Sequence, residues 1–194
     1  MATLIKPESR QQLMGHKPGV VWLTGLSGAG KSTIAFELEL QLHLTGVHTC
    51  VLDGDNLRHG INADLGFTPA DRTRNVLRTA QVARLMADAG LLTIVAMISP
   101  FSKDRLHARE LLLPTPFLEV HVQAPLEMCE ARDPKGLYQK ARQGLLLNFT
   151  GIGSPYEAPS NPDLLLNTST QSLQNCIDLL MNKLKASGLI PSRD

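Results

Sequence analysis

The chain has few cysteines, few aromatic residues and almost no net charge. Its 194 residues include three cysteines, too few and too widely spaced for a disulfide framework or a metal cluster, which indicates reduced thiols and a cytoplasmic location. Lys and Arg number 19 against 18 Asp and Glu, so the strong basic field of a nucleic-acid-coating protein is missing. No apolar run approaches the ~18 residues that a membrane span needs, and no apolar secretory segment opens the chain. We therefore expect no nucleic acid, no membrane and no secretion.

What the sequence does contain is an alternation of short apolar strands with helices. Strands are predicted at Val20–Thr24, Thr49–Leu52, Leu91–Ile98, Phe117–Gln123 and Leu164–Asn167. Helices are predicted at Ser32–Leu44, Pro69–Gly90, Lys103–Leu113, Leu126–Arg132 and Leu173–Lys185. This order predicts an α/β fold with three layers, α/β/α, around a central parallel sheet, in which ligands bind beyond the carboxyl ends of the strands. We expect a flexible arm over residues 1–18 and a single domain over 19–194.

A phosphate-binding loop follows the first predicted strand. The segment Gly25–Ser32 satisfies the pattern G-x-x-x-x-G-K-[ST] and lies between a strand and a helix, which is the context that this motif needs. Its backbone N–H groups can surround a phosphate, Lys31 can reach the β- and γ-phosphates, and the Ser32 hydroxyl can bind Mg²⁺. We predict an ATP site of the P-loop NTPase type formed by Gly25, Leu26, Ser27, Gly28, Ala29, Gly30, Lys31, Ser32 and Thr33.

An acidic turn follows the second predicted strand. Asp53 and Asp55 lie where parallel strands would bring them beside the phosphate loop. A carboxylate at this place can hold Mg²⁺ through water or accept the proton of an attacking hydroxyl. No N-K-x-D motif for guanine recognition is present, so the pattern favours a kinase for a small alcohol over a switch GTPase.

Several cations follow the acidic turn within about twenty residues. Arg72 and Asn75 are three residues apart on the helix predicted from Pro69, so they share a face. With Arg58 they could bind an anionic substrate or form an ordinary solvated surface, and their pattern alone leaves both open. Arg74 and Arg78 are predicted to lie on the solvated surface.

The segments taken together resemble the adenylylsulfate kinase family. The resemblance covers residues 20 to 186 in the family order and is far more selective than the phosphate loop alone. It rests on the segments GLSGAGKST (25–33), DGDNLRHG (53–60), DLGFTPADR (64–72), ISP (98–100), RDPKGLYQKAR (132–142) and NFTGIGSPYEAP (148–159).

The resemblance implies a reaction and a role for each matching residue. ATP and adenylyl sulfate would give ADP and 3′-phosphoadenylyl sulfate, the activated sulfate of sulfate assimilation. Asp55 would orient or deprotonate the ribose 3′-hydroxyl, Lys31 would neutralise the phosphates, and Ser32 and Asp53 would hold Mg²⁺. Arg132 would pack against the adenine of ATP. The implied substrate-binding residues are Asp55, Arg58, Phe67, Arg72, Asn75, Ile98, Ser99, Lys135 and Phe149, with Phe67 and Phe149 stacking on the adenine.

Ser99 also matches the serine that the family resemblance offers as a phosphoserine intermediate. We expect direct transfer instead, because no base is visibly placed to activate this hydroxyl. Two positions depart from the family pattern, Arg74 where Glu is common and Ser102 where Arg is common. The second change is expected to remove a cation near the triphosphate.

The stretch Asp133–Pro159 is rich in glycine, proline and basic residues, and it predicts a short helix and a mobile lid. The resemblance also implies a homodimer, and a separate ATP sulfurylase as a functional partner. Two alternatives stay open: a kinase for another small anionic alcohol, and a regulatory subunit that binds nucleotide without turnover. The second of these predicts damage to the phosphate loop or Asp55, and both are intact.

Overall fold

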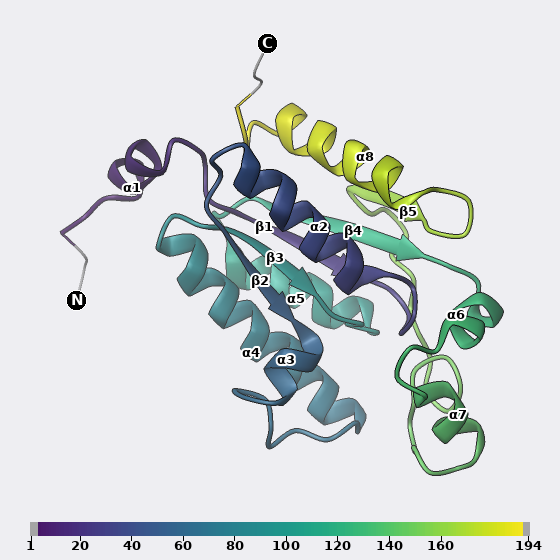
Figure 1. The fold of residues 1–194 in the computed structure, drawn as a ribbon. Helices are drawn as coiled ribbons and strands as arrows, with labels where there is room; N and C mark the ends of the chain where they lie inside the picture. The colour runs from purple at the N-terminus through teal and green to yellow at the C-terminus, as the bar shows by residue number, and fades with distance from the viewer. Residues whose placement is uncertain (1–3, 192–194) are drawn as a thin grey trace.

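One parallel sheet contains all the strands of the described residues, 4–191, in this computed structural model. The strand order is β2-β3-β1-β4-β5, so β1, which leads into the phosphate loop, lies at the centre (Figure 1). The strand bounds are β1 Gly19–Thr24, β2 Thr49–Asp53, β3 Leu92–Ala96, β4 Phe117–Gln123 and β5 Leu164–Asn167. The predicted α/β fold with a central parallel sheet is confirmed.

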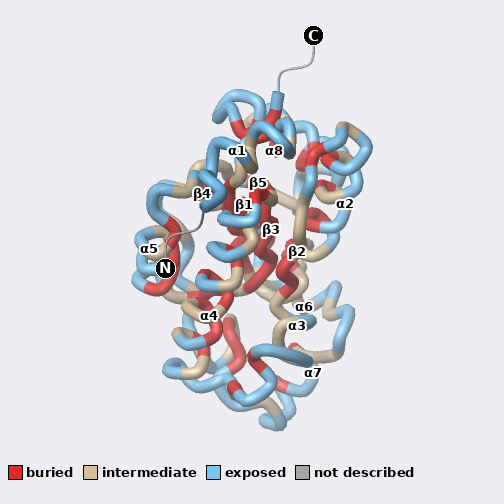
Figure 2. The backbone as a smooth tube through the Cα atoms, turned by 90° about the vertical axis from the view of Figure 1, so that its left-hand side faces the viewer, coloured by how far each residue is buried: buried red, intermediate tan, exposed pale blue. Residues whose placement is uncertain are grey.

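Helices cover both faces of this sheet. The helices α2 (Lys31–Leu44) and α8 (Leu173–Ala186) pack on one face, and α4 (Pro69–Asp88) and α5 (Ser102–Leu112) pack on the other (Figure 1). The alternation of side chains along β1 produces this division, because Val21 and Leu23 join the cluster under α2 and α8. Val20 and Trp22 point the other way, toward α4 and α5. Figure 2 shows the buried strands between mostly exposed outer helix faces.

Local sequence signals explain where α4 begins. The Thr68 hydroxyl accepts a hydrogen bond from the Asp71 N–H at 3.2 Å, and Pro69 occupies the first helical position. The apolar positions predicted for its inner face, Val76, Ala80, Ala83 and Ala87, are all buried.

The structure adds two helices that the pattern did not predict. Helix α1 (Pro7–Met14) lies within the predicted N-terminal arm, whose first three residues lie outside the described ones. The second is the short helix α3 (Gly54–Arg58) in the acidic turn. The predicted helix α6 (Leu126–Arg132) is present, and the short helix of the predicted lid is α7 (Leu137–Arg142). Within residues 4–191 no helix has both the length and the apolar character to cross a membrane.

Candidate functional site

The phosphate loop follows β1 and leads directly into α2, as the motif predicts. Gly28 has φ +75°, and a Cβ atom there would lie 2.7 Å from the Cys129 carbonyl oxygen, so only glycine fits. The Lys31 ammonium lies inside the curve of the loop and donates to the carbonyl oxygens of Gly25 at 2.9 Å and Leu26 at 2.7 Å. The lysine is therefore held in place by the loop that it serves.

Burial gives Lys31 unusual acid–base properties. It lowers the pKa of the ammonium to about 8, and the nearby carboxylates of Asp55 and Asp53 offset part of this effect. A polyanion beside the ammonium would stabilise its charged form, so phosphate binding and lysine protonation support each other.

The acidic turn lies beside this loop. The Ser32 hydroxyl donates to Asp53 Oδ2 at 2.7 Å, while Asp53 Oδ1 caps α3 by accepting from the Asp55 N–H at 3.0 Å. Asp53 is thereby fixed against the start of α2. Asp55 is half-exposed, and one of its oxygens pairs with the Lys135 ammonium, which comes from the segment between α6 and α7.

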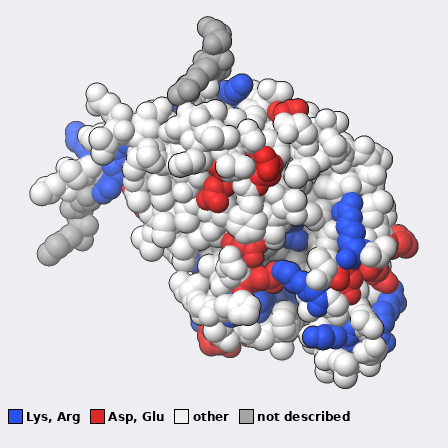
Figure 3. All heavy atoms as spheres, in the orientation of Figure 1, with Lys and Arg blue, Asp and Glu red and all other residues white. Residues whose placement is uncertain are grey.

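These groups line one cleft of about 930 Å³ at the carboxyl ends of the strands. Its size suits a pair of nucleotides or one large ligand. Figure 3 shows Lys and Arg side chains gathered toward the lower right of the molecule, around α6 and α7. The predicted residues that line the cleft are Ser27, Gly28, Gly30, Lys31, Ser32, Thr33, Asp53, Asp55, Arg58, Phe67, Arg72, Asn75, Ile98, Ser99, Arg132, Lys135 and Phe149.

Three residues of the predicted ATP site do not line this cleft: Gly25, Leu26 and Ala29. Ala29 is fully buried, and Leu26 points into a separate hollow. These three residues would contact phosphate through their backbone N–H groups, because the motif uses N–H groups rather than side chains.

The predicted cationic face contains a buried brace. Arg72 donates through Nε to the Phe67 carbonyl at 3.2 Å and through an Nη atom to the Asn148 carbonyl at 2.8 Å. Burial, and secondarily the charge of Arg58, lowers the pKa of Arg72 to about 10. The guanidinium thus joins the backbone of Phe67 to the backbone of Asn148, which lies 76 residues from Arg72 and directly precedes Phe149.

The two phenylalanines have different surroundings. Phe67 is 42% exposed, and the Arg58 guanidinium lies 4.5 Å from its ring centroid. Phe149 is only 5% exposed and packs edge-on against Tyr138, with 4.9 Å between ring centroids. Both line the cleft, so an aromatic base could meet one exposed ring and one buried ring.

Ser99 lies just after β3 in a constrained conformation. It has φ +39°, unusual for a residue other than glycine, and is 2% exposed. Its hydroxyl accepts a hydrogen bond from Trp22 Nε1 at 3.1 Å, and its carbonyl accepts from the buried Arg105 at 2.8 Å. These contacts make Ser99 a fixed part of the cleft wall.

We therefore expect Ser99→Ala to keep a kcat close to that of the unmodified chain. The variant should lose about 1–3 kcal/mol of unfolding free energy, because Trp22 Nε1 loses its buried partner. Steady-state kinetics and urea denaturation measure the two effects separately. A loss of kcat as large as that of an Asp55 variant would instead assign Ser99 a covalent role.

Ser102 contacts the predicted lid. It does not line the cleft, and its hydroxyl and N–H both donate to Glu157 Oε2 at 2.7 Å. Ser102 begins α5 and holds the last part of the predicted lid through Glu157. The expected loss of a cation near the triphosphate at this position stays a prediction. Arg74 is exposed and Arg78 pairs with Asp64 at the surface, as predicted for both.

Sequence reasoning missed one wall of the cleft, at the end of β5. The Thr168 hydroxyl donates to the Ala29 carbonyl at 2.9 Å, and Arg132 donates to the Thr168 carbonyl at 2.8 Å and the Gly28 carbonyl at 3.2 Å. In parallel sheets, ligands bind beyond the carboxyl ends of the strands, and this rule could have indicated the residues after β5. The missed lining residues on this wall are Thr168, Gln171, Leu173 and Cys176.

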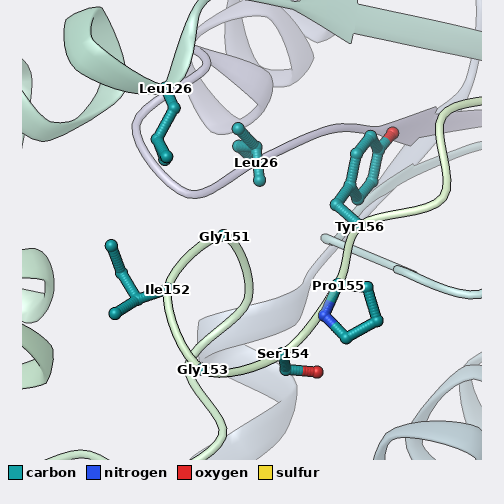
Figure 4. Close-up of a pocket in the computed structure, with 8 residues that line it drawn as sticks. All are labelled: Leu26, Leu126, Gly151, Ile152, Gly153, Ser154, Pro155 and Tyr156. Atoms are coloured by element: carbon teal, nitrogen blue, oxygen red, sulfur yellow. The ribbon is translucent and has the colours of Figure 1, made fainter.

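A second, more open hollow of about 600 Å³ lies beside the phosphate loop. Figure 4 shows Leu26 between Leu126 and Tyr156, with the loop that contains Gly151 and Ile152 across from them. Its lining has no charged side chain, and burial raises the pKa of the Tyr156 hydroxyl to about 12, so it stays neutral. The hollow offers no chemistry for phosphate, and we place the functional site in the larger cleft.

The donor set in that cleft suits a magnesium ion. Ser32 and Asp53 present a hydroxyl and a carboxylate within hydrogen-bond distance of each other, and Mg²⁺ prefers such oxygen ligands. Across residues 4–191 no group of three or more His, Cys, Asp and Glu side chains is arranged to hold a metal by itself. Any Mg²⁺ here would need further ligands from phosphate and water, which is its usual mode of binding.

Comparison with known proteins points to the same family that the sequence resembles. The family model described as adenylylsulphate kinase matches residues 17–167. An adenylyl-sulfate kinase of Oceanobacillus iheyensis is 50% identical over 183 residues, which is 94% of this chain and 92% of that protein. One from Marinobacter nauticus is 53% identical over 177 residues, covering 91% of this chain and 89% of that protein.

A solved structure is similar along most of its length. It is the Mycobacterium tuberculosis APS kinase CysC in complex with AMPPNP and APS, at 48% identity and a TM-score of 0.85. The match covers 88% of this chain and 99% of that one.

Proposed function

This chain belongs to the adenylylsulphate kinase family and is a phosphotransferase that uses ATP, and from this premise we propose how its cleft carries out the reaction. The γ-phosphate of ATP passes to the 3′-hydroxyl of adenylyl sulfate, which gives ADP and 3′-phosphoadenylyl sulfate. One observation carries the proposal: the phosphate loop with Lys31, the carboxylate of Asp55 and the cationic group around Arg58 line the same cleft.

The proton of the attacking hydroxyl goes to Asp55. Its carboxylate lies close enough to Lys31 to affect the pKa of that lysine, so a phosphate held by Lys31 would lie near Asp55. Attack of the 3′-oxygen on the γ-phosphorus forms the new P–O bond as the bond to the β-phosphate oxygen breaks, and Lys31 neutralises the charge on the phosphates. Lys135, now paired with Asp55, is placed to exchange this partner for a phosphate.

Ser32 and Asp53 would hold Mg²⁺ together with the phosphates. Bound there, the ion would supply charge neutralisation to the transferred group. The Asp53 carboxylate is already oriented for metal binding, because it accepts hydrogen bonds from two backbone N–H groups of α3, those of Asp55 at 3.0 Å and Asn56 at 3.4 Å.

Adenylyl sulfate would lie against α4 and the segment that precedes it. Its adenine would stack between Phe67 and Phe149, whose spacing the Arg72 brace controls. Because two of its donors already serve backbone carbonyls, Arg72 would present the rest of its guanidinium to the phosphosulfate group, beside Arg58 and Asn75. Arg132, which ties the phosphate loop to the end of β5, would flank the adenine of ATP.

The test is release of ADP from Mg-ATP with and without adenylyl sulfate. We expect turnover only when both are present, with 3′-phosphoadenylyl sulfate identified as product, and loss of that turnover when EDTA removes the metal. ATP hydrolysis that ignores adenylyl sulfate would favour a kinase for another anionic alcohol. Nucleotide binding without any turnover would favour a regulatory subunit.

We also propose a cytoplasmic homodimer that receives adenylyl sulfate from a separate ATP sulfurylase. Free cysteines support a reducing compartment, since Cys50, Cys129 and Cys176 form no disulfide. Sedimentation of the purified chain tests the dimer, and a single species at the monomer mass of 21.1 kDa would contradict it.

A further inference from the structure

Asn62 is a fully buried polar residue just outside the cleft, in the segment between α3 and α4. Its backbone is anchored at both ends of a turn: its N–H donates to the Leu57 carbonyl at 2.8 Å, and its carbonyl accepts from the Leu65 N–H at 3.1 Å. Its side chain reaches across to α4, where Nδ2 donates to Asn75 Oδ1 at 2.7 Å. Asn62 therefore connects the segment that follows Arg58 to the helix that carries Asn75.

This contact determines which end of the Asn75 amide is available to a ligand. With Oδ1 engaged by Asn62, the free end of the Asn75 amide is Nδ2, a hydrogen-bond donor. Asn75 lines the cleft together with Arg58 and Arg72, whose guanidinium groups are hydrogen-bond donors only. If the Asn75 amide were turned around, a carbonyl oxygen would face the same anion and repel it.

We propose that Asn62 is a positioning residue for adenylyl sulfate: it orients the amide of Asn75 so that its N–H₂ group faces the phosphosulfate anion. The inference rests on the proposed function and adds a residue that does not touch the substrate. Asn62 would thus act on the affinity for the anionic acceptor and would leave the ATP site unchanged.

A second observation argues against a purely structural role. Asn62 Oδ1 is buried and has no hydrogen-bond partner. A buried polar atom without a partner destabilises the fold, and leucine would fill a similar volume without that cost. Packing alone would therefore favour an apolar residue at this position, and the donor that Asn62 gives to Asn75 accounts for the asparagine.

The experiment compares Asn62→Leu, Asn75→Ala and the double variant in the full chain. We expect Asn62→Leu to raise KM for adenylyl sulfate by about ten- to a hundredfold, the range for losing a hydrogen bond to a charged group. KM for ATP and kcat at saturation should stay close to those of the unmodified chain. In the double variant, KM for adenylyl sulfate should equal that of Asn75→Ala, since Asn62 acts only through Asn75.

Thr93→Ala is the matched control. Thr93 is also buried with a hydroxyl that has no partner, but it lies inside β3 and away from the cleft. A change in stability caused at this position should leave both KM values unchanged. Equal rises in both KM values for Asn62→Leu, or effects of the two asparagines that add independently, would overturn the proposal. If the unmodified chain does not use adenylyl sulfate at all, the proposed function fails first, and that result is distinct from either of these.

Discussion

Asp55→Ala is expected to lower kcat by about 10²- to 10⁴-fold, the usual contribution of a positioned general base. The stability of the fold should hardly change, because Asp55 and its partner Lys135 are both half-exposed and such pairs contribute little. Steady-state release of ADP in the presence of adenylyl sulfate measures the first effect, and thermal unfolding measures the second.

Two further variants make this prediction specific. Asp88→Asn removes an exposed carboxylate at the far end of α4 and should leave kcat unchanged. Lys135→Ala removes the partner of Asp55 and should reduce kcat much less than Asp55→Ala does. If the two losses were equal, Asp55 would act by holding the lysine, and its role as a base would be wrong.

The largest effect on stability is expected from Arg105→Met. Arg105 is 3% exposed and makes three bonds: to Glu119 Oε1 at 2.6 Å, to the Ser99 carbonyl at 2.8 Å and to the Glu157 carbonyl at 2.8 Å. Removing Arg105 leaves the largely buried Glu119 carboxylate with only the more distant Arg109 as counter-charge, and breaking a buried pair costs about 3–5 kcal/mol. Urea denaturation should show this loss as a lower midpoint.

Arg109→Met is the matched control for this loss. Arg109 belongs to the same helix and approaches Glu119 at 3.9 Å, but its side chain is 36% exposed. We expect a clearly smaller loss of unfolding free energy for Arg109→Met, because water can solvate the charge that loses its arginine partner there. Adding Glu119→Leu to Arg105→Met should restore part of the lost stability, since the buried charge is then gone. A loss in Arg105→Met no greater than in Arg109→Met would refute the argument.

Arg105 also links the cleft wall to the predicted lid. It fixes the carbonyl of Ser99, whose φ of +39° needs support from its surroundings, and it holds the chain at Glu157, where the predicted lid ends. The mobility of the lid itself stays a prediction, but Arg105 connects its end to the backbone at Ser99, in the segment that follows β3.

The sequence by itself determined the features that depend on near neighbours in the chain. The phosphate loop could be read because its glycines, Lys31 and Ser32 act within one turn between a strand and a helix. The start of α4 could be read because Thr68 caps a helix whose third residue is Asp71. The strands could be placed because β-branched and apolar runs bounded by Gly, Pro and Asp leave few alternatives.

Only the tertiary structure decided which distant groups meet. The Arg72 brace joins residues 76 apart, Thr168 reaches the phosphate loop across 139 residues, and Asn62 orients Asn75 from another segment. Ser102 likewise has its partner 55 residues away at Glu157. Hydrogen bonds between side chains and remote backbone have no period and no fixed spacing, because they depend on how strands are ordered in the sheet. Sequence patterns therefore located the chemistry, and the packing of separate segments set its geometry.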